Sequence, residues 1–402
     1  MKWWLIATWI GWSAIAHAQA SDEGLALPDV RVHGFVSEGG FLSTDNDYIG
    51  KSSRGTLEFF EAAINAQTDL SDKLHVGLQL FSQDEGAQND STPRLDWGFL
   101  DYHWRRELGI RAGRVRIPFG LYNEYIDIDS SRVPILLPQS VYPLTERTVL
   151  NSQTGFLVYG DLPLCHFGSL EYQAYGGELS TPLAPGQDAN SSRLYQIDSK
   201  YIYGGQLFWH PPVDGLRVGG SWLRAGLDEY INLAPALTQL FIMEGVVPPT
   251  FDGNVIGSIR PANFWIASAE YMVDDWQFAA EYSRWFERAR FDPVVLPAAT
   301  SDNERFYGLA AYHINDELAA SAYYSVLYTD VNDRSGSNKM AFPSKYDAWS
   351  RDAAATLRWD VNDHWLWKAE AHFIDGAAYV SATQPMPARY WGMFLVRTTV
   401  TF

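Results

Sequence analysis

Residues 113–148 read GRVRIPFGLYNEYIDIDSSRVPILLPQSVYPLTERT, and this stretch decides how the rest of the chain has to be arranged. It has no sustained period of 2 or 3.6, and its four prolines rule out a long helix or a central strand. It nevertheless carries many apolar side chains, among them Ile117, Phe119, Val141 and Tyr142. Long loops of this kind are usually functional. If the rest of the chain forms a barrel that is wide enough, we expect this loop to lie inside it.

The chain on both sides of this loop is apolar at every second position. In residues 365–374, for example, Trp365 and Trp367 alternate with Lys368 and Glu370. A strand with this pattern fits lipid on one face and water on the other. Short polar turns are predicted at residues 69–73, 105–108, 161–167, 210–215, 273–275, 315–317 and 361–364. Longer connections are predicted at about 43–55, 84–93, 116–150, 179–197, 226–260, 288–302, 331–346 and 376–387.

Seven short turns and eight long connections join sixteen strands, with the short turns on one rim and the long loops on the other. Backbone groups within lipid have to be paired with one another, so a membrane-spanning sheet must close on itself. The predicted fold is all-β: a sixteen-stranded antiparallel transmembrane β-barrel with an inward-folded third loop. We expect a single barrel domain over residues 21–402, with residues 116–148 as the loop inside the lumen.

The two ends of the chain carry signals of export. Residues 1–20, MKWWLIATWIGWSAIAHAQA, combine one lysine, an apolar run and small residues in an A-x-A pattern. These features predict a signal peptide that is cleaved after residue 18 or 20. Residues 390–402 alternate and end in Phe402, which is similar to the assembly signal of outer-membrane barrels. That resemblance implies recognition by the barrel insertion machinery.

The composition of the chain also favours an exported protein of the outer membrane. Aromatic residues make up 15% of the chain, as expected where rings gather at two membrane–water interfaces. After residue 20 no run approaches eighteen apolar residues, so transmembrane helices are excluded. The net charge of −18 argues against nucleic-acid binding, and the single cysteine excludes an internal disulfide. We therefore predict a protein of the bacterial outer membrane, surrounded by outer-membrane lipid and lipopolysaccharide.

The text Gly113-Arg-Val-Arg-Ile-Pro-Phe-Gly-Leu-Tyr-Asn-Glu124 resembles the G-R-x-x-x-P-F-G-x-Y-N pattern of a proteobacterial porin family that is related to the phosphate-selective porins. Close similarity covers about residues 109–145. The layout also resembles the trimeric porins, in which the third loop forms the constriction. The resemblance implies a homotrimer that passes ions and small hydrophilic solutes by passive diffusion. The dense lysine and arginine ladder of the phosphate-specific members is missing from this sequence.

Selectivity in a wide pore comes from its size and from rings of charge. Arginines on the wall that face carboxylates on the loop would set a transverse field across the narrowest point, and the alternative is that these charges pair and pin the loop to the wall. The predicted constriction residues are Arg114, Arg116, Tyr122, Asn123, Glu124, Asp127, Asp129, Arg132, Glu146 and Arg147. The charged residues predicted to line the pore wall are Glu61, Arg217, Glu281, Arg358, Lys368, Glu370 and Arg397. A register slip by one residue would turn these to lipid, at a cost of about 2–4 kcal/mol each.

The sequence offers no catalytic or metal-binding motif. The eight histidines after residue 20 lack metal-ligand spacing, and G-x-S-x-G, G-x-G-x-x-G and Walker patterns do not occur. We predict no cofactor, no metal and no enzymatic activity. Two alternatives stay open. One is a substrate-specific channel for an anion such as phosphate or for another small nutrient. The other is a barrel enzyme or adhesin, which would have a plugged lumen and little conductance.

Overall fold

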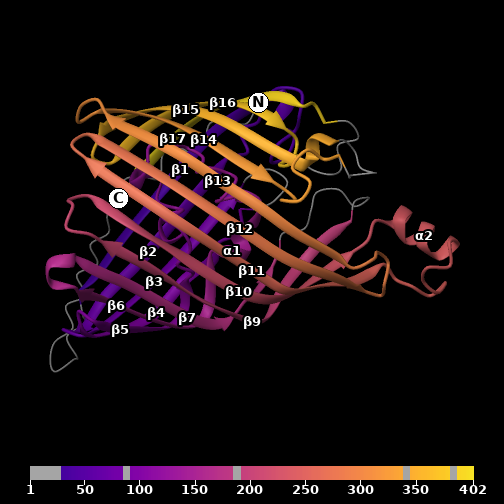
Figure 1. Cartoon of the computed structure of the whole chain (residues 1–402), viewed down its shortest axis with the longest axis horizontal. Coiled ribbons are helices and arrows are strands. Elements are labelled where there is room, and N and C mark those ends of the chain that lie inside the picture. Colours follow the sequence, from indigo (N-terminus) through magenta and orange to yellow (C-terminus); the bar gives the residue numbers. More distant parts are fainter. Residues whose placement is uncertain (1–28, 85–90, 184–191, 338–344, 381–386) are drawn as a thin grey trace, which may run out of the picture.

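The computed structural model describes residues 29–84, 91–183, 192–337, 345–380 and 387–402, so the predicted signal peptide lies outside the described residues. The described strands form one antiparallel sheet, which closes because β1 (Val30–Ser43) pairs with both β2 (Phe60–Ser71) and β17 (Tyr390–Thr401). Figure 1 shows the strands inclined to the long axis, as closure of a barrel requires. The backbone N–H and C=O of Phe402 each pair with Gly34 at 2.9 Å and complete the seam.

Sixteen strands form the barrel wall when β7 and β8 are counted as one. Between β2 and β17 lie β3 (Leu74–Asp84), β4 (Arg94–Arg105), β5 (Leu108–Arg116), β6 (Ser152–Pro163), β7 (Ser169–Glu178), β8 (Ser180–Pro182), β9 (Arg193–His210), β10 (Leu216–Asn232), β11 (Asn254–Val273), β12 (Trp276–Asp292), β13 (Ala299–His313), β14 (Leu318–Tyr328), β15 (Trp349–Asn362) and β16 (Trp365–Gly376). The short β8 pairs with β9 just as β7 does. β7 and β8 thus form one interrupted strand of the barrel, and the seventeen labelled strands make sixteen barrel strands. The predicted antiparallel barrel is confirmed.

The predicted short turns all fall between consecutive strands, whereas some predicted long loops are too wide. The connection predicted at 226–260 is shorter, because β10 continues to Asn232 and β11 begins at Asn254. A strand crosses a bilayer in about 9–11 residues, and β11 has 20. The residues of β11 in excess of this length stay paired with β10 and β12. The helix α2 (Pro235–Met243) lies past one rim of the barrel (Figure 1).

The two faces of the strands separate as the alternation predicts. On β16 and β17, Trp367 and Phe394 are 37% and 52% exposed, whereas Lys368 and Arg397 are 1% and 2% exposed. The apolar side chains therefore face outward and the charged ones face the lumen. No helix among the described residues is both long enough and apolar enough to cross a membrane.

The third long connection lies inside the barrel and supplies much of its core. Between Arg116 and Ser152, the apolar side chains of Ile117 and Phe119 are almost fully buried. Phe119 meets the inward-facing Trp285 of β12 edge-on, and Trp285 stacks on Phe264 of β11 at 4.5 Å. The apolar content of this loop is explained by its burial in the lumen. Short helical turns interrupt it at η3 (Asn123–Tyr125), η4 (Asp129–Ser131), η5 (Leu144–Glu146) and α1 (Arg147–Leu150), and others elsewhere are η1 (Ser52–Arg54), η6 (Cys165–Phe167) and η7 (Lys345–Ala348).

Candidate functional site: the inner loop and the wall that holds it

The first turn of the inner loop requires the glycine of the P-F-G motif. Gly120 has φ +65°, and a Cβ there would lie 2.4 Å from the hydroxyl of Tyr142. Its N–H donates to Ser221 Oγ at 3.0 Å, and its carbonyl accepts from Gln206 Nε2 at 2.8 Å. The motif glycine therefore lets the backbone approach the wall at β9 and β10.

The motif asparagine fastens the two ends of the loop to each other. Asn123 Nδ2 donates to the carbonyl of Ile117 at 2.7 Å and to that of Leu150 at 2.8 Å. The side chain is buried, so its role in this structure is to hold the loop rather than to face a solute. The neighbouring Tyr122 is half-buried, and its hydroxyl accepts from Gln277 Nε2 at 3.4 Å.

A buried ion-pair cluster joins the loop to β4 and β5. Arg116 pairs with Asp127 of the loop and with Asp96 of β4, the latter at 2.5 Å. Asp127 also pairs with Arg147, close to the far end of the loop. Arg114 donates to the backbone carbonyl of Asp96 at 3.0 Å. Basic and acidic groups thus contact each other directly, as expected if these ion pairs hold the loop against the wall. A transverse electric field that acts on solutes stays a prediction.

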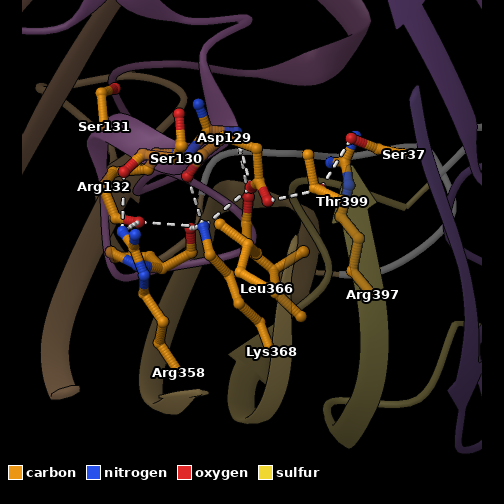
Figure 2. A network of polar contacts seen from close by, with 12 residues as sticks. Ser37, Asp129, Ser130, Ser131, Arg132, Arg358, Leu366, Lys368, Arg397 and Thr399 are labelled. Carbon is orange, nitrogen blue, oxygen red and sulfur yellow. Dashed lines mark hydrogen bonds and ion pairs between the residues drawn. The ribbon is translucent and has the colours of Figure 1, made fainter. Parts of the chain in front are cut away.

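A second cluster joins the loop to β16 and β17, as Figure 2 shows. Asp129 Oδ1 lies 2.8 Å from Lys368 Nζ, and its Oδ2 accepts from the Thr399 hydroxyl at 2.9 Å. Burial alone would raise the pKa of Asp129, but the charges of Lys368, Arg397 and Arg132 outweigh it and hold this pKa below its ordinary value. Asp129 is therefore an ionised, buried anchor.

The pKa of Glu124, where the loop faces β7, is shifted in the opposite direction. Its carboxylate accepts from Gln173 Nε2 at 2.9 Å, and burial raises the pKa of this glutamate above its ordinary value. Arg132 turns back on the loop itself, donating to the carbonyl of Ile126 at 2.5 Å and to that of Ile135 at 3.3 Å. The side chain of Glu146 lies outside the described part of the structure.

Two carboxylates of the wall accept hydrogen bonds from backbone N–H groups of the loop. Glu281 of β12 accepts the N–H of Leu121 at 2.9 Å, and Glu370 of β16 accepts those of Ile135 and Leu136 at 2.7 and 2.9 Å. Each carboxylate replaces water as the acceptor, so these three buried amides stay paired.

The remaining predicted wall residues also face inward. Arg358 of β15 donates to the carbonyl of Ser130 at 2.7 Å. Arg397 pairs with Glu61 across β17 and β2, and Arg217 pairs with Glu270 at 2.6 Å. The sequence reasoning missed several polar residues that bind the loop, and the alternation carried no distinguishing signal for them. They are Gln79, Gln83, Asp96, Asn151, Gln206 and Ser325.

The inner loop separates spaces of very different size. A cavity of about 1200 Å³ opens on the short-turn side, bounded by the loop at Glu124, Tyr125 and Asp129. Beside the loop, one gap of about 70 Å³ lies against β3 to β5, and one of about 20 Å³ lies against Glu61 and Arg397. Residues of the loop therefore line all three spaces.

Comparison with solved structures identifies the architecture. OmpF of Salmonella typhi, in complex with daunomycin, has a TM-score of 0.55 with 13% sequence identity, over 93% of this chain and 98% of that one. OmpT of Vibrio cholerae gives 0.54 with 10% identity over 93% and 97%, and an anion-selective porin from Comamonas acidovorans gives 0.53 with 10% identity over 93% and 99%. This chain has the sixteen-stranded porin fold. Identities this low establish the porin fold alone.

Sequence comparison adds little to the porin fold. No protein-family model matches the chain. An uncharacterized protein of Aquifex aeolicus (strain VF5) is 29% identical over 94 residues, which are 23% of this chain and 19% of that protein. The chain thus matches only about a fifth of the length of this curated relative.

Proposed function

We propose that the chain is an outer-membrane porin that lets ions and small hydrophilic solutes diffuse passively through a lumen narrowed by residues 116–148. The observation that carries the proposal is a closed barrel with an apolar outer face and charged side chains turned to the lumen, such as Lys368 and Glu281. A wall of this kind fits lipid outside and water inside. The proposal includes a homotrimer and assembly through the barrel insertion machinery, both implied by the resemblance noted in the sequence.

The proposed constriction residues act together in this account. Arg116, Arg147 and Asp127 would set the size and charge of the passage near β5, while Asp129 and Lys368 would do so near β16. Phosphate selectivity is a narrower alternative. The two gaps beside the loop are lined by five arginines, namely Arg94, Arg114, Arg132, Arg147 and Arg397, together with the carboxylates of Asp96 and Glu61. Arg147 pairs with Asp127 and Arg397 with Glu61, so the lining is of mixed charge and favours neither sign of ion.

Planar-bilayer recording of the purified protein tests the proposal. A general porin gives ohmic steps with a small reversal potential under a salt gradient. An anion-specific channel gives a reversal potential of anionic sign and a current that phosphate blocks in a saturable manner. Correctly folded protein that gives no current under any condition would refute the channel and favour the enzyme or adhesin alternative.

A further inference from the structure

The wide cavity on the short-turn side carries aromatic rings on one part of its wall. We define the aromatic strip as Trp97 and Phe99 of β4 together with Tyr159 of β6, all of which line the cavity. The rings of Trp97 and Phe99 stack with their centroids 5.3 Å apart and an interplanar angle of 27°. The guanidinium carbon of Arg111, on β5, lies 5.0 Å from the ring centre of Phe99 and 4.8 Å from that of Tyr159. Planar groups therefore follow one another across three neighbouring strands.

Two glycines of the wall make room for these rings. A Cβ on Gly77 of β3 would lie 3.0 Å from the indole of Trp97, and a Cβ on Gly109 of β5 would lie 2.3 Å from the ring of Tyr159. Both glycines are buried, whereas Trp97 and Tyr159 are partly exposed. Each ring therefore covers a glycine on one side and borders the cavity on the other.

The inner loop adds apolar side chains of its own to the cavity. Tyr125 and Ile128 line it and are 52% and 44% exposed, whereas Ile117 and Phe119 of the same loop are almost fully buried. Apolar surface that is removed from water contributes roughly 25 cal/mol per Å². A solute that covers these two side chains and the aromatic strip is therefore stabilised by burial of apolar surface.

Polar groups lie at the edges of the aromatic strip. Arg111 Nε donates to Asp101 at 2.9 Å, and Asp101 also accepts from the Tyr159 hydroxyl at 2.7 Å. The side chain of Arg111 is 30% exposed, so its other N–H groups can reach a solute. On the other side, the side chain of Gln67 lies beside Trp97, over the same glycine. These groups include both donors and acceptors, as hydroxyl groups require.

The arginines that line the cavity are paired with carboxylates. Arg106 lies 2.5 Å from Asp161, and Arg116 lies 2.5 Å from Asp96, just as Arg111 has its own carboxylate partner. A lining of paired charges favours neither anions nor cations. It favours a neutral solute, which can bind without displacing an ion pair.

We propose that this cavity binds a neutral oligosaccharide, with the C–H faces of its sugar rings on the aromatic strip and its hydroxyl groups on Arg111, Asp101 and Gln67. The cavity of about 1200 Å³ is larger than the roughly 300–1,000 Å³ of most small-molecule sites, so it holds several sugar rings together with water. This inference deepens the proposed porin function, and the passage of the saccharide through the barrel rests on that function.

Planar-bilayer recording of the full-length protein tests the site. Maltotriose or cellotriose, added to both compartments, should lower the ion current along a saturating curve, because a binding site fills. Polyethylene glycol of the same hydrodynamic size lacks sugar rings and should lower the current without saturation. Phosphate, added in the same way, tests whether the site prefers an anion.

Variants assign the block to the aromatic strip. Trp97→Ala should raise the half-blocking saccharide concentration roughly tenfold, as expected for the loss of one ring contact, and Trp97→Phe should restore most of the block. Tyr125→Ala changes the loop and leaves the wall intact, so it is the second variant if Trp97→Ala folds poorly. Trp104→Ala is the matched control, because Trp104 lies on the same strand and is 52% exposed on the outer face of the barrel.

Calorimetric titration of each saccharide into the protein in detergent measures binding without a current, and it separates the site from the channel. Saturable block and binding heat that weaken in Trp97→Ala and Tyr125→Ala, but not in Trp104→Ala, support the site. An ion current that both saccharides lower only as polyethylene glycol does, or that phosphate blocks at a lower concentration, overturns the saccharide site and leaves the porin function standing. Binding heat without any ion current supports the site and removes the porin function, and folded protein that gives neither removes both.

Discussion

Replacing Glu281 with Ala removes the carboxylate that holds the first part of the inner loop against β12. This group accepts hydrogen bonds from the Leu121 amide at 2.9 Å, from the Ser268 hydroxyl at 2.5 Å, and from the hydroxyls of Tyr142 and Tyr307. At about 1.5–3 kcal/mol for each bond to a charged group, the gross loss is roughly 6–12 kcal/mol. Removing a buried charge returns several kcal/mol of desolvation. We therefore expect the free energy of unfolding to fall by about 3–5 kcal/mol.

Equilibrium unfolding in urea, with the protein in detergent micelles, measures this change. Tryptophan fluorescence and the gel mobility of the unheated protein report the transition independently. Glu281→Gln is the matched control, because it keeps the volume and one carbonyl acceptor, and we expect it to cost about 1–2 kcal/mol. An Ala variant within about 0.5 kcal/mol of the wild type would refute the view that this carboxylate anchors the loop.

Three further predictions concern charge, packing and assembly. Replacing Arg114 and Arg116 together with Ala should shift the reversal potential towards cation preference, and an unaltered potential would show that these charges only pin the loop. Trp285→Ala should lower the free energy of unfolding by about 3–5 kcal/mol, because the ring is 1% exposed and packs on Phe264. A smaller decrease, measured by urea unfolding, would mean that neighbouring side chains move in and fill the space of the ring. Phe402→Ala keeps the backbone bonds to Gly34, so a reduced yield of folded barrel in outer-membrane fractions would assign the assembly signal to the ring, whereas an unchanged yield would reject it.

The lumen-facing residues could be predicted because a strand gives every side chain one of two directions. Lys368 and Glu370 follow Trp365 and Trp367 on alternating faces, and burial of a charge against lipid would be costly. The inner loop could be predicted because an apolar, proline-interrupted segment needs a place to be buried. Both predictions follow from local pattern and from the solvent on each side of the wall.

The pairing inside the lumen could not be predicted from the same pattern. Asp129 meets Lys368 across 239 positions of sequence, and this contact depends on the path of a loop that has no period. Asp96 was missed because the β3–β4 register shifts between Gln79 and Leu80. An irregularity of this kind breaks the period of two, so alternation alone does not assign its neighbours to a face. The extensions of β10 and β11 were missed because paired strands outside the membrane lack the lipid-facing pattern.

The most direct test of the account compares the single-channel conductance of the wild type with that of a variant lacking residues 125–138, in the same planar bilayers. We predict a larger conductance for the deletion variant, because the segment that narrows the lumen is gone while the sixteen-stranded wall remains. Equal conductance in the two folded proteins would contradict the claim that the inner loop governs passage through the barrel.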